Sequence, residues 1–290
     1  MLSELIKLAR PTHWLKNGVL LVPLIFAGEM RNIAKIEVAL LAMIIFCLLS
    51  SAIYTFNDLI DRDNDRMHPL KKIRPLASGR ISTGTAIAVI IVMTGIGLAG
   101  AWFINSSFFI TALLFLGLNF AYTVVLKDIV ILDAMSVGLS FVLRAFAGAM
   151  AVGVAASTWL LINTLLLALF LSFGKRRHEL VLLEEGATAH RKILGHYSPY
   201  LLDQMIGVTT ASVVVMYMFY TFSSEIMEKL GTHNLYLTIP FVVYGIFRYL
   251  YLIHKKEKGG SPIRVLFTDL PILVTVILWM ITSILILYYL

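Results

Sequence analysis

Four aspartates and six Lys or Arg residues gather within positions 54–80 of a chain that is otherwise apolar. Charged groups beside hydrocarbon are costly, so a membrane protein that concentrates both signs in one segment usually has a functional site there. Carboxylates bind hard cations, while Lys and Arg bind phosphate oxygens. The segment therefore predicts a metal-bridged phosphate or diphosphate site at the edge of a membrane.

The spacing of the aspartates sharpens this prediction. If the preceding helix continues through Asp65, then Asp58, Asp61 and Asp65 share one narrow face, with Asn57 beside Asp61, and Asp63 points away. Such carboxylates repel one another unless a cation joins them. Mg²⁺ takes a few carboxylates and fills its remaining positions with water and phosphate oxygens. We predict that Asn57, Asp58, Asp61 and Asp65 bind Mg²⁺ and that the three aspartates are catalytic.

Two other interpretations of this segment are weaker. Asp61-x-Asp63-x-Asp65 resembles the start of an EF-hand loop. Counted from Asp61, however, the sixth and twelfth positions hold Arg66 and Lys72, where that loop needs Gly and Glu. A solvated loop of alternating charge does not explain why the acids share a helical face. Pro69 disfavours a helical conformation in His68, so the helix is expected to end there and a basic loop to follow.

The composition places these charges in a membrane protein. Of 290 residues, 59% are hydrophobic and 14% charged, and the mean hydropathy is +0.86; soluble domains are usually about 25% charged. The single cysteine excludes a disulfide framework and a cysteine-based zinc site. We expect one polytopic domain over residues 1–290, with about nine membrane-spanning helices. The predicted spans are near 14–29, 36–57, 84–104, 107–125, 131–152, 157–174, 205–224, 235–253 and 266–288.

The loops between these spans indicate orientation and protein class. If the N-terminus is cytoplasmic, nearly all Lys and Arg residues outside the spans lie on that face, and only Arg31, Lys35 and Lys229 lie on the other. The run 38–54 lacks the alternation of an outer-membrane strand. Because most charges cluster at one face, an enzyme is favoured over an alternating-access carrier.

The same residues resemble a known family. Asn57-Asp58-x-x-Asp61-x-x-x-Asp65 resembles the first aspartate motif of the UbiA superfamily of intramembrane prenyltransferases. The continuation to Gly79, D-R-x-H-P-x-K-x-x-R-P-x-A-x-G, resembles the decaprenyl-phosphate phosphoribosyltransferase branch of that superfamily. Three further stretches resemble this branch: Arg10-Pro11-x-x-Trp14-x-Lys16-Asn17, Leu143-Arg144-Ala145-x-Ala147-Gly148 and Gly174-Lys175-Arg176-x-x-Glu179.

The resemblance implies a fold, a reaction and partners. It implies a UbiA-type bundle in the plasma membrane, around a central cavity that opens to the cytoplasm. The implied Mg²⁺-dependent reaction moves 5-phosphoribosyl from 5-phosphoribosyl 1-diphosphate to a polyprenyl phosphate and releases diphosphate. The alternative is a prenyltransferase that moves a prenyl group from its diphosphate to an aromatic or glycerol-phosphate acceptor. No nucleic acid partner is expected, and a homo-oligomer is left open.

The resemblance also extends the set of candidate site residues. The implied substrate-binding residues are Lys16, Asn17, Arg66, Lys71, Arg74, Tyr122, Lys127, Asp133, Arg144, Lys175 and Arg176. The superfamily's second acidic motif departs from its paired D-x-x-x-D form here, because Asp128 and Asp133 are five apart; whether either binds a second metal stays open. Arg144 lies on the helical face of Asp133, about 16 Å further along the axis. It either pairs with an acid for structure or contacts an anionic substrate.

Overall fold

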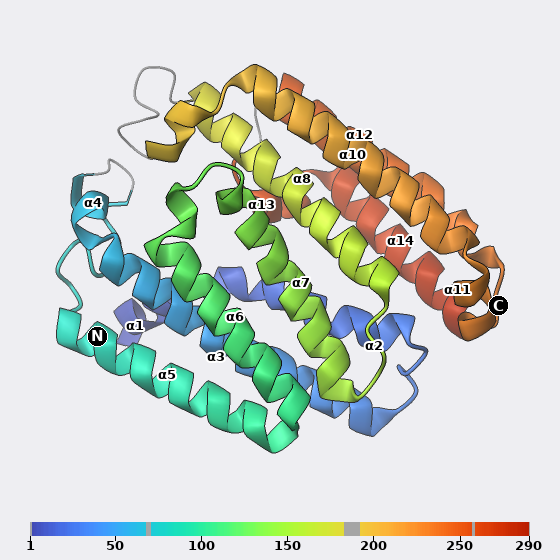
Figure 1. The fold of residues 1–290 in the computed structure, drawn as a ribbon, viewed down its shortest axis with the longest axis horizontal. Coiled ribbons are helices and arrows are strands. Elements are labelled where there is room, and N and C mark those ends of the chain that lie inside the picture. Colours follow the sequence, from blue (N-terminus) through green and yellow to red (C-terminus); the bar gives the residue numbers. More distant parts are fainter. Residues whose placement is uncertain (1, 68–70, 183–191, 257–258, 290) are drawn as a thin grey trace. The chain divides into compact units, whose positions relative to one another are not determined.

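The computed structural model describes residues 2–67, 71–182, 192–256 and 259–289 (Figure 1). All regular elements in these ranges are α- or 3₁₀-helices. Eight of the described helices are long and apolar enough to cross a membrane. The predicted all-α membrane fold is therefore confirmed.

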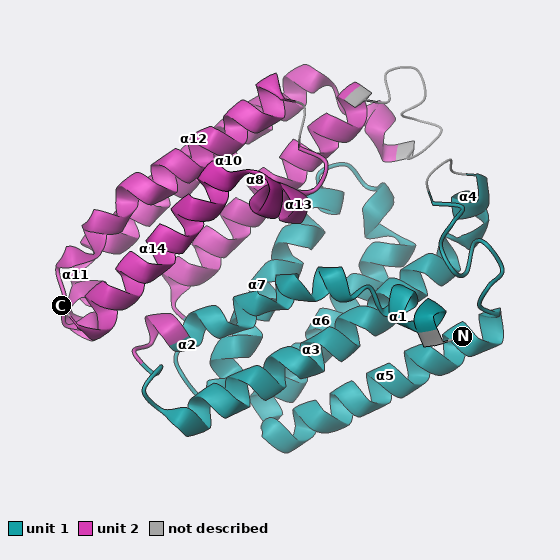
Figure 2. Cartoon of the chain, turned by 180° about the vertical axis from the view of Figure 1, so that it is seen from behind, with its two compact units in different colours: residues 1–24, 29–156 teal, residues 25–28, 157–290 magenta. Residues whose placement is uncertain are grey.

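The helices form two compact units, coloured separately in Figure 2. The first unit comprises residues 1–24 and 29–156, and the second comprises residues 25–28 and 157–290. The first holds α1 (Leu2–Ala9), η1 (Pro11–Leu21), α3 (Ile33–Ile60), α4 (Arg62–Met67), α5 (Thr83–Ile104), α6 (Ser106–Val124), η2 (Leu126–Asp128) and α7 (Leu132–Val152). The second holds α8 (Thr158–Leu182), η3 (Lys192–His196), α10 (Pro199–Phe222), α11 (Ser224–Leu230), η4 (Asn234–Thr238), α12 (Ile239–Lys255), α13 (Pro262–Thr268) and α14 (Leu270–Tyr288). The short α2 (Val22–Phe26) crosses the boundary, and a single domain over 1–290 stays a prediction.

Side-chain caps define where helices of the first unit begin. The Ser82 hydroxyl accepts a hydrogen bond from the backbone N–H of Thr85 at the start of α5. The Asn105 side chain does the same for Phe108 at the start of α6 and also donates to the Met150 carbonyl, at 2.9 Å. Caps satisfy backbone N–H groups that a helix end leaves unpaired. Asn105 in addition ties the beginning of α6 to the end of α7.

An aromatic cluster holds α3 and α6 together. Phe46 of α3 and Phe108 and Phe115 of α6 are fully buried, and the Phe46 ring centroid lies 5.6 and 4.9 Å from theirs. Between membrane helices such close packing, rather than exclusion from water, supplies most of the attraction. The cluster fixes the part of α3 that leads to the aspartates.

The first predicted span differs from the structure. Residues 14–29 do not form one continuous helix; they belong to η1, α2 and the turn after it. An eleven-residue 3₁₀-helix is unusually long. This helix lies close against α7, since the Leu20 carbonyl oxygen would lie only 2.0 Å from a Cβ atom at Gly148 of α7. The absence of a side chain at Gly148 lets η1 lie directly against α7, and Pro23 fits the first turn of the following α2.

In the second unit, an ion pair joins α12 to the start of α14. Arg248, an arginine predicted within a span, donates from Nε and Nη2 to the carboxylate of Asp269, at 3.1 and 2.9 Å. Asp269 also caps α14 by accepting from the backbone N–H of Ile272. A paired guanidinium and carboxylate is the usual arrangement for an ionised side chain in a membrane span.

Candidate active site

The aspartates lie where α3 gives way to α4. Helix α3 ends at Ile60, Asp61 forms a single-residue break, and α4 continues from Arg62. Asp58 and Asp65 are buried, at 2% and 3% exposure, whereas the side chain of Asp63 is 72% exposed. Asp63 points outward, as the helical phase predicts, and is held by Arg62, whose hydrogen bond and charge lower the pKa of Asp63.

Arg74 joins the two buried carboxylates. Its Nη1 lies 3.0 Å from Oδ1 of Asp58 and 2.5 Å from Oδ2 of Asp65. Lys71 lies 4.0 Å from Asp65, and Arg10 forms a further ion pair with Asp58. Because one nitrogen reaches both acids, Asp58 and Asp65 are close neighbours, and their charge is balanced by cations from the following loop and from the N-terminus.

Asp61 is held from another direction. Nζ of Lys127, in η2 after α6, lies 2.5 Å from its Oδ1. Asn57, one turn earlier on α3, donates to its Oδ2 at 3.1 Å. The structure thus brings together residues from three separate parts of the sequence around the end of α3. We refer to Asn57, Asp58, Asp61 and Asp65 with their partners Arg10, Lys71, Arg74 and Lys127 as the carboxylate cluster.

Arg10 belongs to this cluster although it was not among the predicted site residues. Its backbone is left-handed, with φ 50° and ψ 61°, which is uncommon outside glycine. Its guanidinium also lies 5.5 Å from the centre of the Tyr54 ring. Strained backbone of this kind is typical of functional sites. In the sequence, Arg10 directly precedes Pro11 and begins one of the stretches that resemble the phosphoribosyltransferase branch.

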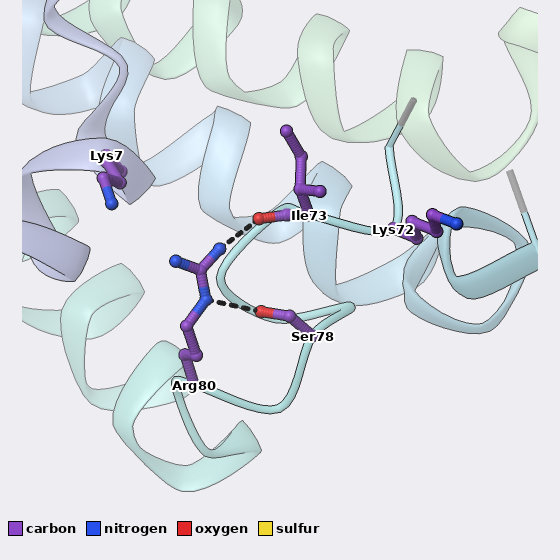
Figure 3. Close-up of a pocket in the computed structure, with 5 residues that line it drawn as sticks. All are labelled: Lys7, Lys72, Ile73, Ser78 and Arg80. Carbon is purple, nitrogen blue, oxygen red and sulfur yellow. Dashed lines mark hydrogen bonds between the residues drawn. The ribbon is translucent and has the colours of Figure 1, made fainter. Parts of the chain in front are cut away.

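The loop that carries Arg74 is braced by Arg80. The Arg80 guanidinium donates to the Ile73 carbonyl and, from Nε, to the Ser78 hydroxyl at 2.8 Å (Figure 3). Lys7 and Lys72 line the same open pocket. Gly79 supplies the left-handed turn, with φ 74°. The bracing explains how a loop at the protein surface positions Arg74.

The chemistry of the donor set fits a divalent cation. In the described part of the chain, no three acidic, histidine or cysteine side chains lie close enough to hold an ion together. The carboxylate cluster nevertheless offers three carboxylates and an amide from neighbouring turns, all of them oxygen donors, which Mg²⁺ prefers. In this arrangement Arg10, Arg74 and Lys127 balance the acids. The assignment of the metal ligands stays a prediction.

A second polar group lies within the first unit, around Arg144. Its Nε donates to Oδ1 of Asn17 at 2.8 Å, and its Nη1 donates to the hydroxyl and carbonyl of Ser140 at 2.8 and 3.0 Å. Arg144 is 4% exposed, and Asn17 is fully buried. Asn17 in turn donates to Sγ of Cys47. The guanidinium also lies 4.6 Å from the centre of the Phe115 ring.

Lys16 is a second cation in this region, near Arg144. It is half-buried, and burial, followed by the nearby charges of Arg144 and Arg10, lowers its pKa to about 8. The phenol of Tyr122 is also close enough to act on this charge. Three predicted substrate-binding residues, Lys16, Asn17 and Arg144, thus lie together.

The remaining predicted residues lie elsewhere. Asp133 is fully buried at the start of α7, whereas Asp128 is exposed. Arg66 pairs with Asp63 and the Ala77 carbonyl rather than with the carboxylate cluster. In the second unit, Arg176 and Lys175 lie 3.2 and 3.6 Å from Glu179. Their binding roles stay predictions, and the expected helix end at His68 and Pro69 lies outside the described residues.

Replacing Arg74 by glutamine is expected to lower the free energy of unfolding by about 1–3 kcal/mol, because Asp58 and Asp65 lose a shared partner while Arg10 and Lys71 remain. Thermal unfolding in detergent measures this loss. Arg62→Gln is the matched control, since Arg62 pairs with the exposed Asp63. An equal effect of the two substitutions contradicts the bridging role of Arg74.

These features define a polytopic helical membrane protein with a charged site suited to phosphate groups. The sequence model of the UbiA prenyltransferase family matches residues 20–270. The chain belongs to this family, and it is an enzyme of the UbiA prenyltransferase type.

Named relatives and solved structures agree with this placement. The chain is 32% identical over 236 residues to a decaprenyl-phosphate phosphoribosyltransferase of Mycolicibacterium smegmatis, covering 80% of this chain and 74% of the relative. It is 29% identical over 283 residues to the protein of the same name from Corynebacterium glutamicum, covering 95% and 84%. A UbiA homolog from Archaeoglobus fulgidus, solved with GPP and Mg²⁺, has the same fold, with a TM-score of 0.75 at 21% identity over 99% of this chain and 100% of that one.

Proposed function

We propose that the protein transfers the 5-phosphoribosyl group from 5-phosphoribosyl 1-diphosphate to a polyprenyl phosphate and releases diphosphate. The similarity to decaprenyl-phosphate phosphoribosyltransferases over most of both chains carries the proposal. The excess of cations around the carboxylate cluster supports it. Arg10, Lys71, Arg74 and Lys127 outnumber the three aspartates, and Lys16 and Arg144 lie beyond them.

The proposed reaction requires that the two substrates be positioned and that the negative charge on the departing diphosphate be stabilised. An oxygen of the lipid phosphate forms the new bond to C1 of the ribose, and the bond from C1 to the diphosphate oxygen breaks, through an oxocarbenium-like state. The lipid phosphate is already an anion, so no strong general base is needed. Asn57, Asp58, Asp61 and Asp65 would hold Mg²⁺, which would supply charge neutralisation to the departing diphosphate. Lys71, Arg74 and Lys127 would bind and orient phosphate oxygens of the substrates.

A prenyltransferase that uses a prenyl diphosphate is the alternative, since the same carboxylate cluster suits any diphosphate donor. The binding of GPP and Mg²⁺ by the UbiA homolog from Archaeoglobus fulgidus, which has the same fold, supports this alternative. The two functions differ in what the enzyme does with a phosphoribosyl donor, and one assay separates them.

The test is transfer by purified protein with Mg²⁺, ribose-labelled phosphoribosyl diphosphate and polyprenyl phosphate. Label that enters the lipid phase and depends on both substrates is the expected result. Label that stays in water, together with consumption of a prenyl diphosphate in the presence of an aromatic acceptor, contradicts the proposal and supports the alternative.

We also propose that the protein lies in the plasma membrane with the carboxylate cluster facing the cytoplasm. The asymmetric distribution of Lys and Arg between loops supports this orientation. The single Cys47 is buried, so an Asp63→Cys variant introduces one exposed thiol beside the cluster. We expect a membrane-impermeant thiol reagent to label it in inverted vesicles and not in intact cells.

The pKa of Lys16 predicts an alkaline limit on activity. Near pH 8 its ammonium deprotonates beside Arg144, Arg10 and Tyr122, and attraction for an anionic substrate weakens. The kcat/KM for that substrate should therefore fall above about pH 8, because this ratio reports ionisation of the free enzyme. Arg stays charged at this pH, so Lys16→Arg should extend the plateau. Identical profiles for the two proteins contradict the role of Lys16.

A further inference from the structure

Arg144 is a buried cation that has no carboxylate partner among the residues that the structure describes. Within the described residues its polar contacts are Asn17 and Ser140, which are neutral, and two phenylalanine rings at 4.6 and 5.2 Å. The other arginine within a predicted span, Arg248, has the carboxylate of Asp269. A charge without a counter-ion in a membrane interior is unfavourable in free energy. Pairing with Asp269 lowers this free energy for Arg248, whereas Arg144 has no such partner among the described residues.

The guanidinium keeps hydrogen-bonding capacity for another molecule. Nε donates to Asn17 and Nη1 donates twice to Ser140, whereas no described residue accepts a hydrogen bond from Nη2. This nitrogen is not among the fully enclosed unpaired polar atoms, so part of it faces accessible space. A planar guanidinium with free N–H groups at its edge matches phosphate oxygens.

Two neighbours strengthen the attraction for an anion. Lys16 is close enough for Arg144 to act on its charge, and in the described structure no acidic side chain pairs with Lys16. Asn17 is fixed by Cys47 and Ser50, so it holds the guanidinium in one orientation. The group differs in this respect from the carboxylate cluster, where each of the four cations has an acidic partner.

We propose that Arg144, Lys16 and Asn17 form a binding site for a phosphate monoester, distinct from the metal and diphosphate site. The assignment deepens the proposed function and rests on it for the identity of the ligand. Arg144 and Lys16 contact the phosphate, and Asn17 is a positioning residue. Two substrate groups have this chemistry, the 5-phosphate of the ribosyl donor and the phosphate of the lipid acceptor.

The decisive variant is Asn17→Asp, which places a carboxylate beside Arg144 at nearly unchanged size. The new carboxylate pairs with the guanidinium and competes with phosphate, while the fold gains a buried ion pair. We expect binding of ribose 5-phosphate or of farnesyl phosphate, measured by calorimetry in EDTA, to weaken tenfold or more. Ribose and farnesol serve as probes without phosphate. Asn32→Asp makes the same change at the exposed cap of α3 and should leave affinity unchanged.

Each outcome decides the assignment. Weakening confined to ribose 5-phosphate assigns the site to the donor, and weakening confined to farnesyl phosphate assigns it to the acceptor. Unchanged affinity of both phosphates in a folded Asn17→Asp protein, or wild-type protein that binds neither phosphate better than its alcohol, overturns it. The binding measurement needs neither metal nor turnover. A protein that binds phosphate in EDTA but fails to transfer phosphoribosyl in the separate assay with Mg²⁺ therefore refutes the proposed function and leaves the site standing.

Discussion

Asp61→Asn is expected to lower kcat by about a thousandfold, because it removes a charged ligand from the site that stabilises the departing diphosphate. The effect should be on chemistry rather than on folding. The Asp61 side chain is 25% exposed, and its ion pair with Lys127 lies near the surface, so the free energy of unfolding should change by only about 1 kcal/mol. Single-turnover kinetics at saturating Mg²⁺, together with thermal unfolding, measures both quantities.

Asp63→Asn is the matched control for this prediction. The residue lies two positions away, has the same chemistry and pairs with Arg62 and Arg66, but it faces outward. Its free energy of unfolding should change by less than about 0.5 kcal/mol, as for most surface substitutions, and its turnover should stay close to that of wild type because the side chain lies outside the proposed metal site. Near-normal turnover of Asp61→Asn removes Asp61 from the proposed metal ligands. An equal loss in both variants shows instead that the charge of the whole segment matters.

The helical class, the carboxylate face and most spans follow from the sequence because they depend on local periodicity. Apolar runs of membrane-crossing length and the spacing of Asp58, Asp61 and Asp65 are visible without tertiary information. The outward position of Asp63 is predicted for the same reason, since side chains two residues apart on a helix point to different sides.

What the sequence does not provide is contact between distant segments. Arg10 reaches Asp58 across 48 positions, and Arg144 reaches Asn17 across 127. Contacts between residues so far apart in the sequence leave no local pattern. The first predicted span fails similarly: hydropathy marks residues 14–29 as apolar, but it carries no signal for the close approach of η1 to Gly148, far along the chain. The neutral surroundings of Arg144 are likewise a tertiary property.

Because η1 lies so close to α7 at Gly148, Gly148→Ala is the second substitution with a large expected effect. An added Cβ would meet three backbone atoms of Leu20, its carbonyl oxygen at 2.0 Å and the carbonyl carbon and Cα at 2.7 and 2.8 Å. Backbone cannot rotate away as a side chain can, so η1 must separate from α7. We expect a loss of about 3 kcal/mol in the free energy of unfolding, near the upper end for overpacking, measured by thermal unfolding in detergent.

The same displacement should reach the Arg144 site, because Asn17 lies one turn before Leu20 on η1. The surviving folded fraction of Gly148→Ala should bind phosphate monoesters more weakly, since Asn17 no longer holds the guanidinium. Gly117→Ala on α6 is the control: nothing lies within 4 Å of the added Cβ, and alanine favours helix by about 0.5–1 kcal/mol. That variant should be at least as stable as wild type. Equal stability of the two variants contradicts the close contact of η1 with α7. It then also contradicts the inference that this contact lets Asn17 of η1 hold the Arg144 guanidinium.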